Sequence, residues 1–200
     1  MNSLLDGPVR TLIAGLAIAS LALAAWLLAA PVDSRGLVSV LLRFVHVASA
    51  MAWIGLVFFV NFVQLAALEA ADEASRSAIA KWIVPRVAAG VRHASHLVVL
   101  TGALLLVATG YLLGEWVYSS AVYMPGPRVL MLAAGAAGGF LMWGFVNLAI
   151  WPALKVALGE TGGGADAQAH ARQTVKRYAR LNLLLALPVT LAMVAAAHLS

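Results

Sequence analysis

The chain has no cysteine, and only 10% of its 200 residues are charged. The missing cysteine excludes disulfides, thiolate metal sites and covalent attachment of c-type haem. Soluble domains are about 25% charged and about 45–50% apolar, whereas 63% of this chain is hydrophobic. The composition therefore predicts an integral membrane protein in the lipid bilayer. The net charge of +5 does not indicate a nucleic-acid partner, because the basic residues lie between apolar runs and form no polar face.

Five apolar runs are long enough to cross a membrane, which takes about 20 mainly apolar residues in a helix. Their approximate bounds are 11–30, 37–65, 93–113, 129–154 and 181–199. The first run is longer than the apolar core of a signal peptide, so we expect it to be retained as a span. The sequence thus predicts a single all-α membrane domain, residues 1–200, folded as a bundle of five transmembrane helices. The loop over residues 69–92 is polar and then amphipathic, which favours a helix along the membrane surface.

Lysine and arginine are distributed unevenly between the two sides of this predicted bundle. Ten lie before the first span, between the second and third spans, or between the fourth and fifth, and the three on the other side are Arg35, Arg43 and Arg128. Loops rich in Lys and Arg remain in the cytoplasm. We therefore predict that the N-terminus is inside and the C-terminus outside, in the inner (cytoplasmic) membrane of a bacterium.

The second span contains a line of residues at helical spacing that should face the bundle interior. The line runs through Ser39, Arg43, His46, Ala50, Trp53 and Val57, with Gln64 beneath them. Neutral imidazole is a good axial ligand for haem iron, and an arginine one turn nearer the interface can pair with a propionate. His46 and Arg43 therefore suggest half of a b-type haem site. The alternative is a packed histidine bonded to a neighbouring helix, with Arg43 extending to the surface.

A second axial ligand requires another histidine at a similar depth. His198 ends the fifth span on the same outer side, and at about 1.5 Å per residue His46 lies about 10 Å or less below that surface. The two histidines can therefore form an axial pair. His93 and His96, three residues apart at the inner end of the third span, are weaker candidates. They suggest a second inner site, a proton path or interfacial histidines.

Other features bear on packing and on the class of activity. Gly135 and Gly139 are four residues apart, which favours close helix contact. Pro188 is expected to kink the fifth span. No paired carboxylates or nucleophile motif support a hydrolase, and no matched broken helices support a transporter. The sequence leaves open whether the chain is an enzyme.

Three runs resemble the membrane domain of bacterial membrane-bound urate oxidase (urate hydroxylase), in the stand-alone form without its cytochrome c domain. They are LLRFVHVASAMAWIGLVFFVNFVQ, MWGFVNLAIWPALK and ARLNLLLALPVTLAMVAAAHL. The matching positions are Arg43, His46, Trp53 and Gly55, then Trp151, Pro152 and Lys155, and finally Asn182, Pro188, Met193 and His198. The resemblance implies that Arg43, Trp53 and Gly55 contact a cofactor and that His46 and His198 bind its metal.

The chain also departs from that family. His93 and His96 stand where a Trp and a Met are expected, and an Asn expected near Phe145 is displaced to Asn147. Full-length members transfer electrons to a cytochrome c domain, and the long polar insertions of those members are missing. These departures do not favour urate oxidation by this chain alone.

Two functions from different classes follow from the sequence. The first is an electron-transfer module that holds haem b near the periplasmic face and exchanges electrons with a quinone or a cytochrome c-type partner. The second is a non-catalytic accessory subunit of a larger respiratory or photosynthetic membrane complex, docked on other membrane subunits or on copies of itself through its Gly and Ala faces. A transporter or channel is a third and weaker alternative.

Overall fold

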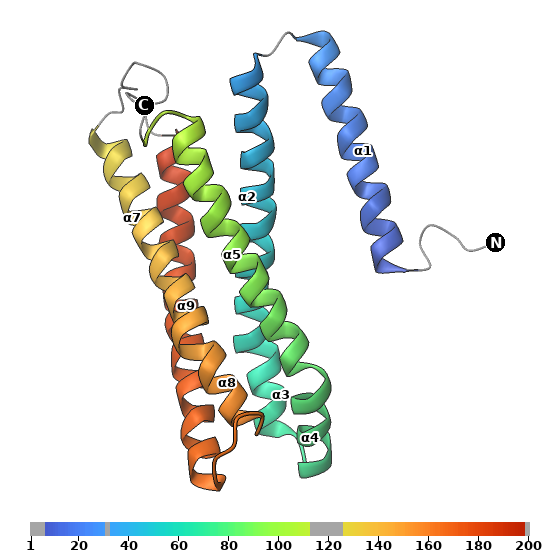
Figure 1. The fold of residues 1–200 in the computed structure, drawn as a ribbon, viewed down its shortest axis with the longest axis vertical. Coiled ribbons are helices and arrows are strands. Elements are labelled where there is room, and N and C mark those ends of the chain that lie inside the picture. Colours follow the sequence, from blue (N-terminus) through green and yellow to red (C-terminus); the bar gives the residue numbers. More distant parts are fainter. Residues whose placement is uncertain (1–6, 31–32, 113–125, 199–200) are drawn as a thin grey trace, which may run out of the picture. The chain divides into compact units, whose positions relative to one another are not determined.

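The computed structural model describes residues 7–30, 33–112 and 126–198. These residues form helices and turns and no β-strand, as predicted (Figure 1). The helices are α1 Pro8–Ala29, α2 Ser34–Phe59, α3 Leu65–Ala70, α4 Glu73–Trp82, α5 Val84–Ala108, α7 Gly126–Gly144, α8 Trp151–Ala157 and α9 Ala165–His198, and the wider π-helical turns are η1 Val60–Gln64 and η2 Phe145–Ile150.

Five continuous helical stretches in the described residues are long and apolar enough to cross a membrane. They cover residues 8–29, 34–70, 73–108, 126–157 and 165–198. Each contains most or all of one predicted span, so the number of helices able to cross a membrane agrees with the sequence. The chain divides into two units, residues 1–38 and residues 39–200.

The first unit contains α1 and the first residues of α2. Pro8 lies in the first turn of α1, where its missing N–H and fixed φ do no harm. No side chain of α1 is buried. The Asp33 carboxylate accepts a hydrogen bond of 2.7 Å from the Gly36 N–H and thereby caps the start of α2.

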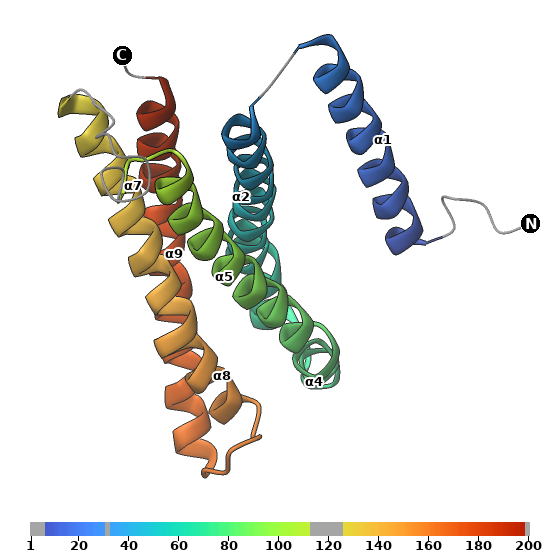
Figure 2. The same ribbon diagram turned by 45° about the horizontal axis from the view of Figure 1, so that its top comes forward.

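The second unit is a bundle in which α7 and α9 run side by side, as two views show (Figures 1 and 2). A Cβ placed on Gly138 would lie only 2.5 Å from Cγ2 of Val189, and one on Gly135 would lie 3.1 Å from Met193. Nothing lies within 4 Å of a Cβ on Gly139. The predicted glycine contact is therefore made by Gly135 and Gly138, and Gly139 takes no part in it.

The bundle interior combines a small apolar core with buried polar groups. The core consists of Trp53, Val57, Val91, Met142, Val146 and Ala186. It joins α2, α5, α7, η2 and α9 near the middle of the bundle. In lipid, helices gain little from hiding apolar surface, so close packing and interhelical hydrogen bonds hold such a bundle together. The many apolar side chains on the outside are the expected lipid-facing surface.

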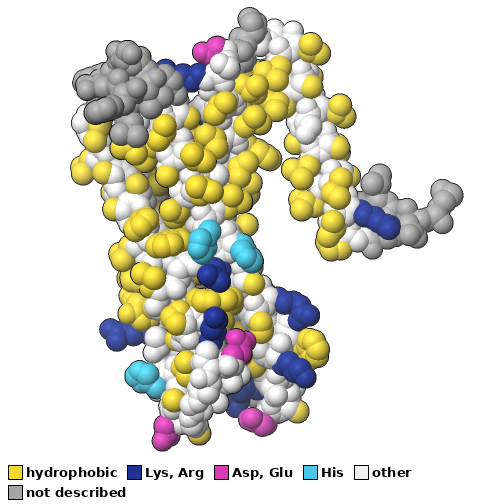
Figure 3. Space-filling model, viewed as in Figure 1, with side chains coloured by type: hydrophobic (Ala, Val, Ile, Leu, Met, Phe, Trp, Pro, Cys, Tyr) yellow, Lys and Arg dark blue, Asp and Glu magenta, His cyan; other side chains and the backbone are white. Residues whose placement is uncertain are grey.

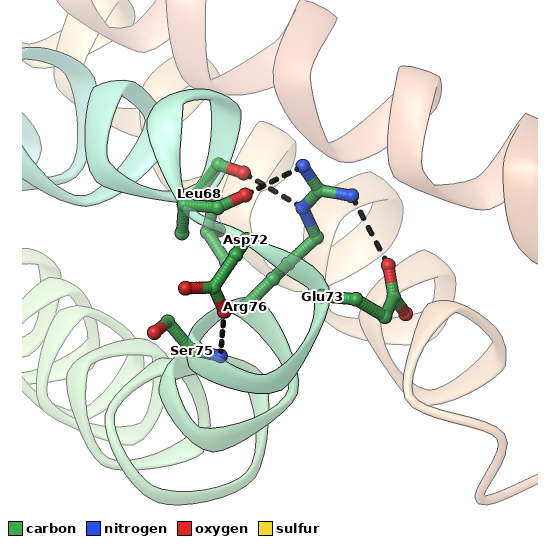
Figure 4. A network of polar contacts seen from close by, with 6 residues as sticks. Leu68, Asp72, Glu73, Ser75 and Arg76 are labelled. Atoms are coloured by element: carbon green, nitrogen blue, oxygen red, sulfur yellow. Dashed lines mark hydrogen bonds and ion pairs between the residues drawn. The ribbon is translucent and has the colours of Figure 1, made fainter.

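A sharp corner separates α3 from α4 (Figure 4). The Asp72 carboxylate accepts a hydrogen bond of 2.8 Å from the Ser75 N–H and caps α4. The Arg76 guanidinium donates to the carbonyls of Leu68 and Ala71, each at 2.9 Å, and so ties α4 to the end of α3. The predicted surface helix over residues 69–92 is also divided at Ile83, between α4 and α5, because Pro85 lies in the first turn of α5 and the residues that follow it continue that long helix.

The turn between α8 and α9 uses glycine where the backbone requires it. Gly159 has φ of +78° directly after α8, a conformation that only glycine adopts without strain. Its N–H bonds the Val156 carbonyl, and the Glu160 N–H bonds the Lys155 carbonyl at 2.9 Å. This arrangement ends α8 by satisfying its last carbonyls. The chain then reverses and starts α9 at Ala165.

Charged side chains are concentrated at one end of this unit. In Figure 3 most of the Lys, Arg, Asp and Glu side chains on the visible face of the bundle lie at the end formed by α3, α4 and α8, and the surface above them is mainly hydrophobic. Lys176 on α9 pairs with Glu69 there at 2.5 Å. We call this the basic end, because it carries the two loops with most of the Lys and Arg.

Candidate functional site

His46 contacts α5 through one side of its ring. Its Nδ1 lies 3.0 Å from the Val98 carbonyl oxygen and 3.2 Å from Oγ1 of Thr101. The carbonyl only accepts, so Nδ1 must carry the proton in this contact. The Thr101 hydroxyl donates to the Leu97 carbonyl at 2.6 Å, which leaves its oxygen free to accept from His46 as well.

The same contact leaves the other ring nitrogen available. With the proton on Nδ1, Nε2 of His46 carries a lone pair, and no described residue donates to it. Histidines that bind metals are usually held in this way, with one nitrogen donating to a backbone carbonyl and the other facing the metal. The half-buried imidazole therefore has the tautomer that a metal ligand needs.

Gly102 makes room for the imidazole. A Cβ at this position would lie 3.0 Å from Cε1 and 3.4 Å from Nδ1 of His46. Real Cβ atoms rarely approach another atom so closely, so any larger residue would displace the ring. The position of His46 thus depends on a glycine 56 positions later in the sequence.

The other predicted cofactor contacts are placed differently. Trp53 is 2% exposed, and its indole Nε1 has no hydrogen-bond partner among the described residues. Arg43 and Gly55 are exposed on α2. The predicted inward-facing line is therefore buried at Trp53, Val57 and Gln64, half-buried at His46, and at the surface at Arg43.

His198 is exposed at the end of α9, and its Nδ1 lies 2.9 Å from the Val194 carbonyl of the same helix. Asn61 on η1 donates to the Ala179 carbonyl at 3.1 Å, which marks one level shared by the two helices. At about 1.5 Å per residue, His46 lies about 22 Å and His198 about 28 Å along the helices from that level. The two histidines therefore lie at similar heights, but no described contact joins them.

His93 and His96 are exposed on α5. His96 Nδ1 lies 2.7 Å from the Arg92 carbonyl, and its ring meets Trp143 edge-on with centroids 5.8 Å apart. The described residues contain no cluster of three or more His, Asp or Glu side chains able to hold a metal ion. A site at either histidine would need ligands from outside this group.

A polar cluster that the sequence did not predict lies beside these histidines. Arg92 Nε donates to Oδ1 of Asn147 at 3.3 Å, and Nδ2 of Asn147 donates to the Trp143 carbonyl at 3.0 Å. The Arg92 guanidinium lies 4.4 Å from the centre of the Trp151 ring, and Lys155 Nζ lies 5.7 Å from the same centre. Asn147, noted in the sequence only as displaced, thus holds an arginine inside the helix bundle.

A second feature is a cavity of about 60 Å³ on the basic-end side of the apolar core. Its polar wall consists of Asn61, Gln64 and Asn182, from η1 and α9. Each of these amides is more than nine-tenths buried, and each has a side-chain oxygen without a hydrogen-bond partner in the described structure. We call this the amide cavity.

The helical period of the sequence contains a signal for the amide cavity. Asn61 and Gln64 follow Val57 by four and seven residues, so they continue the inward-facing line of α2. The sequence interpretation included Gln64 but omitted Asn61, and it reached Asn182 only through the family resemblance. Their convergence depends on contacts between helices far apart in sequence.

Comparison with known proteins adds no assignment. No family model matches the chain, and no curated protein or solved structure matches it.

Proposed function

We propose that this chain is a membrane-embedded electron-transfer module of a bacterial inner membrane that binds b-type haem through His46 near its outer face. The electron partner would be a quinone or a cytochrome c-type protein. One observation carries the proposal: the proton of His46 is held on Nδ1 by the Val98 carbonyl, and Nε2 is left without a partner. A polar nitrogen without a partner is costly in an apolar membrane span, so a ligand at Nε2 would explain why a histidine stands there.

The residues around His46 fit one axial position of a haem. Val98 and Thr101 orient the ring, and Gly102 leaves the space that the ring occupies. Bound haem would supply a one-electron centre whose potential depends on its axial ligands and on the polarity around them. The chain's own contribution is to fix the tautomer and orientation of His46.

The second ligand we propose is His198, which lies at a similar height and also has its Nδ1 on a backbone carbonyl. Arg43, one turn nearer the outer end, would pair with a propionate. Both side chains are exposed in the described structure, so they would have to turn towards the group when it binds.

The test is the absorption spectrum of protein purified after expression with added haem precursor. We expect the Soret and α bands of a low-spin haem, and we expect His46→Ala to abolish them. His93→Ala is the matched control, because His93 is an exposed histidine on α5 without a described ring contact. Gly102→Ala should weaken or shift the bands without removing them, because it displaces the ring that donates the ligand.

Colourless wild-type protein that remains colourless after reconstitution with haem would rule the proposal out. So would a spectrum that is unchanged in His46→Ala. If His198→Ala replaces the low-spin bands with the spectrum of a five-coordinate haem, His198 is the second ligand.

The alternative is a non-catalytic accessory subunit of a larger respiratory or photosynthetic complex. The exposure of Arg43, Gly55 and His198 favours it, as does the location of the amide cavity on the far side of the core from His46. In that case the protein would be colourless and would copurify in a fixed ratio with redox subunits in mild detergent. Solitary, colourless protein would contradict both functions.

A further inference from the structure

Three buried amide oxygens in the bundle interior have no hydrogen-bond donor among the residues that the structure describes. They are Oδ1 of Asn61, Oε1 of Gln64 and Oδ1 of Asn182, and the three residues are 3%, 8% and 1% exposed. Most buried polar atoms in folded proteins are hydrogen-bonded, so three unpaired acceptors around one cavity are unusual. An unpaired acceptor in an apolar interior costs free energy, and no contact within residues 7–30, 33–112 and 126–198 offsets this cost.

The donors of these amides do not explain their position. Asn61 uses its Nδ2 on the carbonyls of Val57 and Ala179, at 2.9 and 3.1 Å. Asn182 donates to the Tyr178 carbonyl of its own helix at 3.4 Å, which is a weak contact. The Nδ2 nitrogens of Asn61 and Asn182 are therefore engaged, and their Oδ1 atoms are left without a donor among the described residues. The missing partner must therefore be a hydrogen-bond donor.

The size of the cavity limits what that donor is. Its volume of about 60 Å³ is walled mostly by apolar side chains, including Val60, Val91, Ile150 and Leu154. A cavity needs about 10–15 Å³ to hold one water molecule, and that water needs two to four polar partners. The space therefore accommodates a few water molecules and is too small for an aromatic ring or a lipid headgroup.

The charges around the cavity favour a neutral donor. Trp151 forms part of its wall, and both Arg92 and Lys155 lie within 6 Å of the centre of that ring, at 4.4 and 5.7 Å. In the part of the chain that the structure describes, no carboxylate lines the cavity. Two positive charges without a carboxylate in the wall disfavour a metal cation or an ammonium group.

We propose that the amide cavity is a water-binding site, in which a small cluster of water molecules donates hydrogen bonds to Asn61, Gln64 and Asn182. Water exchanges with this site from the basic end of the bundle. The apolar core of Trp53, Val57 and Met142 separates it from His46, so water reaches only the basic-end half of the bundle. The inference does not depend on haem and applies equally to the accessory subunit.

The missing cysteine makes a direct test available. A single cysteine has an S–H stretching band in a clear region of the infrared spectrum, and contact with D₂O converts it to S–D. We would place cysteine at Ala179 or Val175, which line the cavity. The matched control is Ala186→Cys, on the same helix in the dry core and 0% exposed.

We expect the S–H band of Ala179→Cys and Val175→Cys to exchange at least about tenfold faster than that of Ala186→Cys, because a closed core reaches water only by local unfolding. Two cavity positions are used in case one of the variants does not fold. Size-exclusion chromatography checks that each variant is folded. If folded Ala179→Cys and Val175→Cys exchange as slowly as the core control, the cavity is dry and the proposal is wrong.

A second variant separates a wet cavity from a dry one by the sign of its effect. Asn182→Leu keeps the approximate shape of the side chain and removes the unpaired oxygen. If water satisfies that oxygen, the variant loses hydrogen bonds, so its melting temperature falls and exchange at Ala179→Cys slows. If the cavity is dry, the variant removes a buried oxygen that has no hydrogen-bond donor, so its melting temperature rises. A rise overturns the proposal whatever the haem spectrum shows.

Discussion

At the scale of single residues, the Asp72 side chain determines where α4 begins by capping its first turn. The hydrogen bonds from the backbone and hydroxyl of Ser75 stabilise its charged form and lower the pKa of the Asp72 carboxyl. Because the pKa is lower in the folded protein, this contribution to stability is present at neutral pH. It is lost as the pH falls through the folded-state pKa of Asp72.

We therefore predict that the start of α4 opens in acid. Amide hydrogen exchange at Ser75 should lose protection as the pH falls below the usual range of an aspartate. Asp72→Asn should retain most of the protection, because an amide oxygen also caps a helix, and it should lose the pH dependence. Asp72→Ala should lack protection at every pH. Equal pH dependence in wild type and Asp72→Asn would show that another group is responsible.

Individual residues were only partly predictable. The sequence singled out His46 as a polar residue in an apolar span, and the alternative that it bonds a neighbouring helix agrees with its contact to α5. Its partners Val98 and Thr101 were not predictable, because they lie 52 and 55 residues away. The haem role of His46, His198 and Arg43 stays a prediction.

At the scale of elements, α7 and α9 are held together by shape. Gly138 faces Val189, a β-branched residue with little freedom to move, and the neighbouring Gly139 faces open space. The two glycines differ in nothing but the direction in which each Cβ would point. They form a matched pair for measuring how tightly the helices pack.

We predict opposite effects for alanine at these two positions. Gly138→Ala should destabilise the bundle by about 1–3 kcal/mol, because the new methyl overlaps Val189. Gly139→Ala should be neutral or stabilise it by about 0.5–1 kcal/mol, because alanine costs less backbone entropy in a helix. Reversible unfolding in mixed micelles measures both. Equal effects would mean that α7 and α9 are not in contact as described.

Elements were predicted better by position than by length. Each apolar run became a helix, but α9 starts at Ala165, well before the predicted start at residue 181. Apolar length locates only the part of a helix that lipid surrounds. The polar segment before it is helical because Ala, Gln, Arg and Lys favour helix in water as well, and hydropathy does not report that.

At the scale of the whole molecule, the basic residues predict an orientation in the membrane. The turn between α8 and α9 is flanked by Lys155 and by the arginines of α9, and it belongs to the basic end. The helical stretch that runs from α7 through η2 to α8 begins at the end opposite the basic end. The rule for Lys and Arg puts the basic end in the cytoplasm.

This orientation predicts which positions react with a membrane-impermeant thiol reagent. Gly126→Cys, at the exposed start of α7, should react in intact cells. Thr161→Cys, exposed in the turn after α8, should react only after the membrane is opened. The reverse pattern would invert the topology and move His46 to the cytoplasmic half. Wild-type protein is the blank, because it has no thiol.

The number of helices was predictable because lipid imposes a length on each apolar run. The packing partners were not, because side-chain shapes such as Gly102 against His46 decide them, and a pattern along one chain does not contain them. The amide cavity was predictable only in part. Asn61 and Gln64 on η1 continue the helical period of α2, whereas the wall from α9 depends on the folded bundle.

The two π-helical turns have a consequence for insertions and deletions. Each turn of this kind contains one residue more than an α-helical turn. Deleting one residue from Val60–Gln64 would therefore leave an ordinary α-helical turn, and the residues on either side of it would keep their faces. The same deletion within the α-helical part of α2 would rotate all later residues of that helix by about 100° about its axis. A one-residue gap should therefore be tolerated better at η1 than one turn earlier in the same helix.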